Sequence, residues 1–354
     1  MLSKGFWRFT MRILVTGGAG YIGSHACQRL LRDGHHIVAL DNLHRGHREP
    51  MEMLKSAHVE SFHFVHADLG DTKAVLDALD GHDLDTVMHF GALAYVGESV
   101  EDPLWYYRNN IVSAIGLLDA CDQCHGGKGI SRFIFSSSCA TYGDPPEGMI
   151  PVPESCPQSP TSPYGYTKLH MEHILKDYAT KRDMDDNPIA LTMLRYFNVA
   201  GSDRTGMLGE DHTPETHLIP VAIEAALGKR ESLSIFGTDY PTEDGTNVRD
   251  YVHVEDLIDA HVLAMNTTRA GEVEAFNVGI GKGYSVRQIL DSVKRVSGVD
   301  FPVHDAPRRA GDAIALYNNP ERIKSTLGWD AKIMDIDEIV STAFNWMKDH
   351  PGGY

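Results

Sequence analysis

The sequence is poor in cysteine and in basic residues. Five cysteines at irregular spacings in 354 residues are too few for the disulfide framework of a small secreted domain. Lys and Arg number 32 against 49 Asp and Glu, which gives a formal net charge of −17. Because nucleic-acid binding needs a basic surface, this balance argues against nucleic acid as a main partner. It leaves room for a phosphate-bearing small molecule, for which a few local donors are enough.

Long apolar runs are also missing. No stretch of about 18 apolar residues occurs, so the sequence predicts no membrane span. Residues 1–10 contain no apolar segment long enough for a signal peptide, and we interpret them as an extension before a core that begins at Met11. With so few cysteines, we expect a cytoplasmic enzyme. Cys121 and Cys124 form one C-x-x-C pair without a second pair, so we predict no metal site.

What the sequence does contain is a regular alternation of short apolar runs and helical patterns. The expected strands are 12–16, 36–40, 62–66, 86–90, 133–136 and 189–197. The expected helices between them are 21–33, 71–79, 103–124 and 164–181. This order predicts a Rossmann-type α/β fold, a doubly wound parallel sheet with right-handed crossovers.

The regular alternation of expected strands and helices ends after residue 198. Residues 200–216 are rich in Gly, Asp and Thr, which indicates a loop. Shorter elements are then expected, namely helices at 218–227, 254–265, 286–296 and 336–348 and strands at 233–236 and 275–278. We therefore predict an NAD-type nucleotide domain over 11–198 and a smaller α/β substrate domain over 199–354, with some segments of the second returning to the first.

A glycine-rich turn follows the first expected strand. Residues 17–23 read GGAGYIG, a G-x-x-G-x-x-G pattern between a strand and a helix, which lets a pyrophosphate approach the helix N-terminus. Asp41 lies 18 residues beyond Gly23 at the end of the second strand, near the spacing of a carboxylate that binds the adenosine ribose. Such a carboxylate repels a 2′-phosphate, which favours NAD over NADP. Asp68 follows the third strand and could accept a hydrogen bond from the adenine amino group.

Tyr164 and Lys168 are candidate catalytic residues. Their spacing of four at the start of a helix places them on one face. A tyrosine with a pKa of about 10 is a poor base at neutral pH. A nearby ammonium and a positive nicotinamide ring favour the phenolate, which can then accept a proton from a sugar hydroxyl. The pair lies one strand beyond the serine run 136–138.

Longer segments carry a resemblance to a known family. They include TGGAGYIG at 16–23, SSSCATYGD at 136–144, PYGYTK at 163–168 and IFGTDYPTEDGTNVRDYVHVEDL at 235–257. On these residues the sequence resembles the extended short-chain dehydrogenase/reductase superfamily and, within it, the UDP-glucose (UDP-galactose) 4-epimerases and related UDP-sugar 4-epimerases. The resemblance implies an NAD-dependent isomerase that oxidises C4 of the hexose, lets the 4-keto sugar rotate and reduces it from the other face. It also implies a homodimer built from the helices that begin near Asp102 and Tyr164.

The resemblance further implies a role for individual residues. Tyr164 would be the general base and acid, Lys168 would orient the nicotinamide ribose and lower the tyrosine pKa, and Ser138 would relay the proton. With the motif residues above, the implied NAD-binding set is Gly17, Gly20, Tyr21, Ile22, Gly23, Asp41, Asn42, Asp68, Leu69, Phe90, Gly91, Asn109, Ser136, Tyr164, Lys168 and Tyr196.

A UDP-sugar would be bound by residues that lie mostly in the second domain. The implied set is Ser138, Tyr164, Asn198, His217, Leu218, Phe236, Arg249, Arg309, Asp312 and Leu316. Arg249 and Arg309 would clamp the diphosphate, for which forked guanidinium donors are suited. Asn198 and His217 would contact phosphate. In the nucleoside pocket, Asp312 would bind the uridine ribose and Phe236 would pack beside the uracil.

Four alternatives to a UDP-glucose epimerase are considered. UDP-galactose enzymes often carry lysine at position 94, which is Ala94 here. This alanine and the tracts AYVGESV and SCATYG keep a UDP-xylose/UDP-arabinose epimerase as an alternative. Leu316 is intermediate in size, so UDP-GlcNAc remains possible but is not favoured. A dehydratase or decarboxylase would carry acids at positions 139 and 140, which are Cys and Ala here. A non-catalytic NAD-binding protein would have no reason to keep a complete serine, tyrosine and lysine set.

Overall fold

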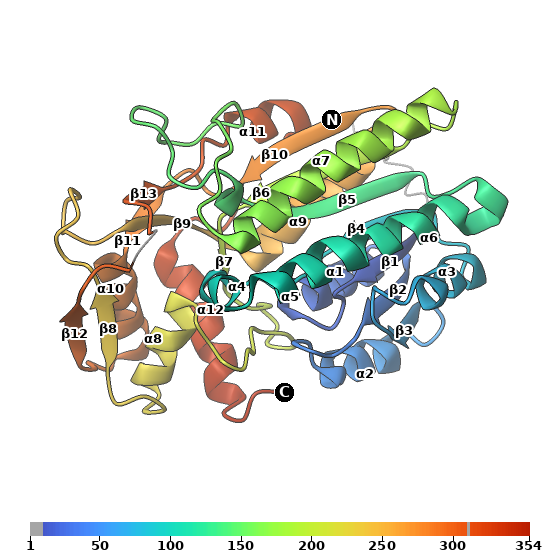
Figure 1. Cartoon of the computed structure of the whole chain (residues 1–354). Coiled ribbons are helices and arrows are strands. Elements are labelled where there is room, and N and C mark those ends of the chain that lie inside the picture. The colour runs from blue at the N-terminus through green and yellow to red at the C-terminus, as the bar shows by residue number, and fades with distance from the viewer. Residues whose placement is uncertain (1–9, 310–311) are drawn as a thin grey trace, which may run out of the picture.

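A seven-stranded parallel sheet forms the centre of the molecule (Figure 1). The computed structural model describes residues 10–309 and 312–354, so the extension expected over 1–10 lies outside the described residues except for Thr10. The strand order is β10-β6-β5-β4-β1-β2-β3. The strands are β1 (Arg12–Thr16), β2 (His36–Asp41), β3 (Phe62–His66), β4 (Thr86–His89), β5 (Arg132–Ser138), β6 (Ala190–Tyr196) and β10 (Val273–Val278). The Rossmann-type fold predicted from the sequence is confirmed.

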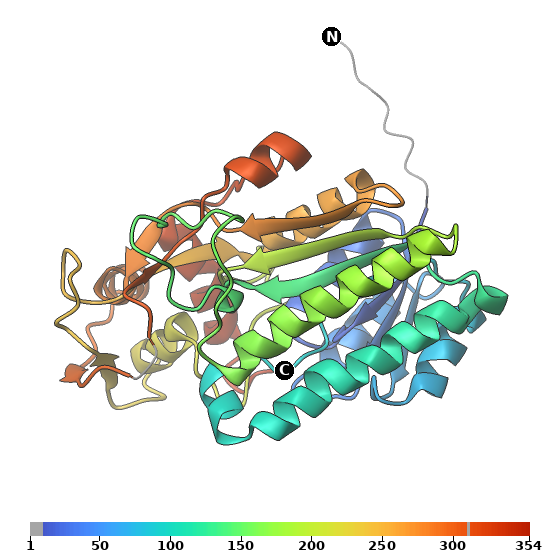
Figure 2. The same cartoon turned by 45° about the horizontal axis from the view of Figure 1, so that its top comes forward.

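Helices cover both faces of this sheet. On one face lie α1 (Tyr21–Arg32), α2 (Arg48–Ala57) and α9 (Val254–Thr267), and on the other α3 (Thr72–Gly81), α6 (Ser113–Gly127) and α7 (Pro163–Met184). Side chains alternate along a strand, so Ile13 and Val15 of β1 pack into the first core whereas Leu14 packs into the second. Figure 2 shows α6 and α7 side by side on the second face. Within the described part of the chain, no helix has the length and apolar character needed to cross a membrane.

The single helix expected over 103–124 is interrupted. A short α4 (Val96–Glu101) precedes α5 (Pro103–Tyr107), and a π-helical turn over Arg108–Val112 separates α5 from α6. Asp102 caps α5, since its Oδ1 accepts from Trp105 N at 3.1 Å. The π turn coincides with the burial of Asn110, whose amide bonds the Leu93 backbone and donates to Thr167 Oγ1 at 3.0 Å. The helical pattern alone did not reveal this change of pitch.

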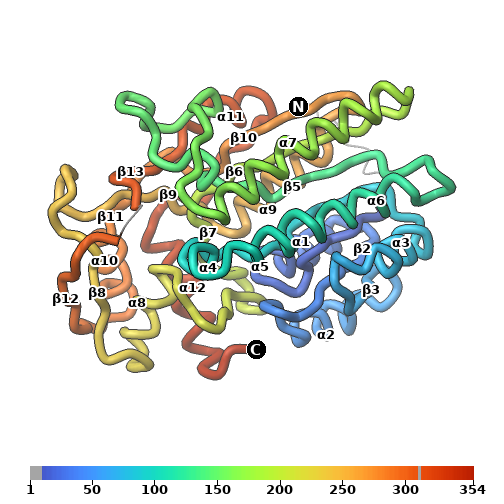
Figure 3. Tube along the Cα trace, in the orientation of Figure 1, coloured from blue at the N-terminus to red at the C-terminus, as the bar shows by residue number. Residues whose placement is uncertain are grey.

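A smaller region lies beside the carboxyl ends of the strands. Its helices are α8 (Leu218–Ala226), α10 (Val286–Ser297) and α12 (Ile336–Asp349), whereas α11 (Glu321–Leu327) contacts β10 and α9 at the edge of the large sheet. Its strands form one pair, β8 (Leu233–Phe236) with β12 (Val303–Ala306), and a group in which β9 (Val248–His253) contacts β7 (Asn198–Ala200), β11 (Gly283–Ser285) and β13 (Ala315–Leu316). The chain also returns to the large sheet, because β10 pairs in parallel with β6 (Figure 3).

Candidate active site

The glycine turn opens the N-terminus of α1 at the carboxyl edge of the sheet. Gly17 has a φ of +67°, and a Cβ there would lie 2.6 Å from Gly91 N. A Cβ on Gly23 would lie 2.0 Å from Gly17 O. Gly20 is the N-cap of α1 without a side-chain cap, and Tyr21 and Ile22 begin the first turn. The backbone N–H groups of the first turn of α1, which have no partner within the helix, are therefore available to an anion, as a dinucleotide pyrophosphate requires.

Acidic and amide side chains gather at the ends of β2 and β3. Buried Asp41 accepts from Ala19 N through Oδ2 at 3.1 Å, which ties the end of β2 to the glycine turn. Burial raises the pKa of Asp41, and the backbone N–H groups of Leu43 and Ala19 partly offset that rise. Asn42 Nδ2 donates to Asp68 Oδ2 at 2.7 Å. The structure thus brings the predicted ribose and adenine residues to one edge.

The segment that follows β4 lies next to the glycine turn. Phe90 N donates to Thr16 O at 3.0 Å, and a Cβ on Gly91 would lie 2.9 Å from Leu69 Cδ1. These three expected NAD residues therefore adjoin the glycine turn. Asn109 is farther along the chain in the π turn, where its Nδ2 donates to Asn110 Oδ1 at 2.9 Å. Sequence analysis did not single out the buried Asn110, because a helical pattern does not distinguish the two adjacent asparagines.

Five hydroxyl and amine groups meet where β5, β6 and α7 come together. Lys168 is 4% exposed, and its Nζ donates to Ser136 O at 2.7 Å. The hydroxyls of Ser136 and Tyr196 are hydrogen-bonded to each other, and Ser138 bonds the hydroxyl of Tyr164. The whole predicted serine, tyrosine and lysine set is therefore in one place.

Burial controls the protonation of this cluster. It raises the pKa of Tyr164 to about 12, although the hydrogen bond with Ser138 lowers it. Burial also lowers the pKa of Lys168 to about 7, because the ammonium is removed from water. Lys168 is not among the groups that shift the pKa of Tyr164 in the protein without NAD.

Strands β7, β9 and β13 bring further predicted residues together. Asn198 in β7 hydrogen-bonds Tyr251. Arg249 donates from Nη1 to the carbonyls of Val248 and Ala313, both at 2.9 Å, and its Nη2 lies 3.9 Å from Asp312 Oδ1. The cross-strand partner of Arg249 is Leu316. The guanidinium is thus pre-oriented beside two other candidate substrate residues.

Arg309 lies elsewhere, in the loop after β12. Its guanidinium carbon lies 3.8 Å from the ring centroid of Phe236, which is 37% exposed at the end of β8. This cation–π contact occupies a face of the ring that we expected to pack beside uracil. The two arginines assigned to one diphosphate therefore lie on separate segments, Arg249 on β9 beside Asp312 and Arg309 in the loop after β12, over Phe236.

His217 has partners that the sequence analysis missed. It precedes α8, whose first residue is the half-buried Leu218, and its Nδ1 lies 2.8 Å from Glu215 Oε1 and 3.0 Å from Glu210 Oε1. A phosphate would thus have to be contacted by Nε2. The spacing E-x-H-x-x-E-x-H over 210–217 was a signal in the sequence that could have found these glutamates.

The fold and the cluster at its carboxyl edge define a nucleotide-dependent enzyme class, and the comparisons agree. Residues 13–279 match the NAD dependent epimerase/dehydratase family, and the chain belongs to this family. It is 44% identical to UDP-glucose 4-epimerase of Lactobacillus helveticus over 345 residues, which are 97% of this chain and 99% of that protein. It is 42% identical to UDP-arabinose 4-epimerase 1 of Arabidopsis thaliana, covering 97% and 80% of the two chains.

Solved structures give the same result. The crystal structure of UDP-glucose 4-epimerase from Bifidobacterium longum in complex with NAD+ and UDP superposes with a TM-score of 0.90 at 34% identity, covering 97% of this chain and 100% of that one. The UDP-Glc/GlcNAc 4-epimerase of Campylobacter jejuni superposes with a TM-score of 0.81 at 41% identity, covering 96% and 99%. The resemblance stated from the sequence is confirmed, and the protein is an NAD-dependent enzyme.

Proposed function

We propose that the protein is a UDP-sugar 4-epimerase that interconverts UDP-glucose and UDP-galactose. The observation that carries this proposal is the meeting of Ser138, Tyr164 and Lys168 beside the glycine turn of the NAD-type sheet. The similarity to UDP-glucose 4-epimerases over nearly the full chain supports it. We assign NAD to the sheet built by residues 11–198 together with β10, and the UDP group to the smaller region.

The proposed mechanism uses side chains whose positions follow from α7 and β5. NAD, when bound, accepts hydride from C4 of the sugar and later returns it. Tyr164 takes the proton from the O4 hydroxyl and returns it to the same oxygen, and its hydrogen bond to Ser138 provides a route for that proton. Lys168, held by Ser136 O, would orient the nicotinamide ribose. Contacts from Arg249 to the UDP group would anchor the substrate while the sugar turns.

The residues that follow Ser138 argue against a dehydratase. Cys139 and Ala140 stand where such an enzyme carries acids. Cys139 is buried, and burial raises the pKa of its thiol to about 12, so it remains a neutral thiol at physiological pH. Neither side chain can supply acid–base catalysis next to the serine, which favours epimerisation within this family.

The preferred sugar is a separate question that product analysis answers. The purified protein is incubated with UDP-galactose, UDP-glucose, UDP-xylose and UDP-GlcNAc in turn, and products are separated by chromatography. We expect interconversion of the two hexoses to be the fastest reaction. Faster conversion of the pentose would instead assign the chain to the UDP-arabinose epimerases, several of which are 42–43% identical to it.

Leu316→Tyr is expected to suppress any UDP-GlcNAc turnover by at least about tenfold relative to UDP-glucose turnover, since one crowded group costs 1–3 kcal/mol. Leu316 is 8% exposed and packs in a cluster with Cys139 and Phe197, so a larger ring must extend toward the sugar. The ratio of kcat/KM for the two substrates checks this. Ile314→Tyr, two residues earlier and exposed, is the control. An unchanged ratio in Leu316→Tyr would contradict the proposed place of this residue.

We also infer a homodimer formed through α5, α6 and α7. Leu104 and Val112, on α5 and the π turn, are 62% and 63% exposed, and Ile115 on α6 is also exposed. Exposed apolar side chains that cluster in this way are typical of an interface.

We also propose that the protein is cytoplasmic. This placement rests on the cysteines, all five of which are free and buried.

Val112→Asp is expected to weaken dimerisation by at least about 100-fold, because a charge would be buried without a partner at the interface. Light scattering over a range of concentrations measures the mass in solution. Val59→Asp, which changes a 70% exposed valine away from these helices, should leave the mass unchanged. Equal masses for the wild type and Val112→Asp at every concentration would refute this interface.

A further inference from the structure

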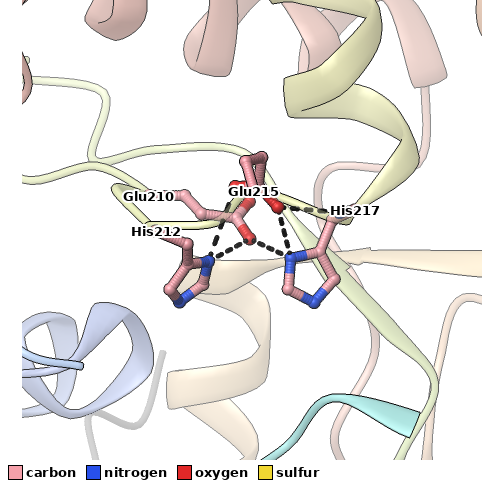
Figure 4. A group of neighbouring side chains, drawn as sticks. All are labelled: Glu210, His212, Glu215 and His217. Atoms are coloured by element: carbon pink, nitrogen blue, oxygen red, sulfur yellow. Dashed lines mark hydrogen bonds and ion pairs between the residues drawn. The ribbon is translucent and has the colours of Figure 1, made fainter. Parts of the chain in front are cut away.

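Four metal-ligating side chains converge in the loop before α8 (Figure 4). They are Glu210, His212, Glu215 and His217, and one ligand atom from each lies within 4.8 Å of the others. Both imidazoles direct Nδ1 toward the two carboxylates, as Figure 4 shows. Only His217 belonged to a predicted site, and there as a phosphate donor, while the sequence analysis predicted no metal at all.

Four of the distances in this cluster are close to the edge of a coordination tetrahedron. His217 Nδ1 lies 2.8 Å from Glu215 Oε1 and 3.0 Å from Glu210 Oε1, and His212 Nδ1 lies 3.2 Å from Glu210 Oε1 and 3.5 Å from Glu215 Oε2. Bonds of about 2.0–2.1 Å from zinc to nitrogen and oxygen place neighbouring ligands about 3.4 Å apart. We propose that these four side chains bind a divalent first-row metal ion, zinc in the first place.

The state of His212 is a second, independent observation. Its Nδ1 atom is buried and, within the described part of the chain, has no partner with hydrogen-bond geometry. The nearest acceptor, Glu210, is close but misaligned, and the side chain of Glu210 is itself almost fully buried. A buried lone pair or N–H without a partner is costly, and a metal ion between the nitrogen and the carboxylates would satisfy it.

The ligand types select the kind of ion. Two imidazole nitrogens with two carboxylate oxygens suit zinc and its first-row neighbours, whereas magnesium and calcium prefer oxygen ligands alone. Four protein ligands close the coordination sphere, which is typical of a structural rather than a catalytic zinc. Tyr95 makes edge-to-face contacts with both imidazoles, with ring centroids 5.9 and 5.8 Å away, so an aromatic side chain limits the access of water.

The position of the cluster indicates what the ion would hold together. Tyr21, in the first turn of α1, contacts the ring of His212 and donates from its hydroxyl to Gly201 O at 2.5 Å. On the other side, the loop continues directly into α8 at Leu218. An ion here would fix residues 210–217 between the glycine turn and α8. A metal bound to Nδ1 would leave Nε2–H of His217 as a hydrogen-bond donor. Donation from this group to a substrate phosphate rests on the proposed function, whereas metal binding itself does not.

Metal content and cobalt spectra test the site directly. The untagged enzyme with its NAD is treated with a chelator, titrated with Zn²⁺ or Co²⁺, and analysed by mass spectrometry of the metal. We expect one tightly bound equivalent per chain, visible absorption bands of four-coordinate Co²⁺, and a Zn²⁺-dependent rise in Tm. Mg²⁺ should produce none of these changes. Absence of a bound equivalent would show that the four groups form only ion pairs, which overturns the proposal.

Variants separate this site from surface histidines. Outer-sphere changes already weaken metal binding 10–100-fold, so His212→Gln, which removes a ligand, should lower Zn²⁺ affinity by at least about 100-fold. Glu210→Gln is the second variant should the first fail to fold, as judged by its NAD content. His304→Ala, on the exposed strand β12, should bind as the wild type does. Equal affinity in wild type and folded ligand variants would refute the site, and none of these readouts depends on epimerase activity.

Discussion

Tyr164→Phe will lower kcat by about 10³-fold while the enzyme still holds its NAD. The phenol is the one group of the cluster proposed to carry the substrate proton, and positioned acid–base groups contribute 10²–10⁴-fold to rate. The change removes only an oxygen, so the ring stays beside Lys168, whose Nζ lies 5.9 Å from its centroid. Lys168 remains bonded to Ser136 O, so the NAD side of the site is preserved.

The measurement is kcat with UDP-galactose together with the amount of NAD that copurifies. Tyr166→Phe is the matched control, since it removes the same atom from an exposed tyrosine two residues later on α7. Loss of NAD together with activity would point to a structural role for the hydroxyl. Activity near that of the wild type would show that Tyr164 is not the proton carrier.

Gly23→Ala will reduce NAD content by at least about tenfold. The added Cβ would lie 2.0 Å from Gly17 O and 2.8 Å from Gly17 C, and both are backbone atoms that no side-chain rotation can move away. The N-terminus of α1 and the turn must therefore separate, which displaces the N–H groups that would bind the pyrophosphate. Overpacking of this kind also destabilises a fold by about 1–3 kcal/mol.

NAD content by absorbance, and thermal unfolding by circular dichroism, check this prediction. Gly81→Ala, at the end of α3, is the control because its Cβ would meet nothing within 4 Å. A folded Gly23→Ala enzyme with wild-type NAD content would contradict this prediction, because it would mean that α1 can move away from the glycine turn without loss of NAD binding. Re-addition of NAD distinguishes weakened binding, which excess cofactor restores, from a misfolded chain.

Most of the large sheet and the catalytic set could be predicted because their signals are local. The strand β1, the glycine turn and α1 follow one another directly, and Tyr164 and Lys168 share one turn of helix. The short strands β7, β9 and β13 were not predicted. The three residues of β7 and the two of β13 carry no usable periodicity, and pairing with the six-residue β9 is what makes them strands. Leu316 meets Arg249 across 67 residues of sequence.

By itself the sequence determined the class of fold and the choice of NAD and predicted the proton-transfer residues that we propose, since each depends on residue types at fixed spacing along one element. Tertiary structure decided the rest. It buried Lys168, and this burial lowers the pKa of the lysine to about 7. It also folded Glu210, His212, Glu215 and His217 toward one point. The burial of Lys168 and the convergence of two like-charged carboxylates both depend on packing from several elements, so they cannot be predicted from any single stretch of sequence.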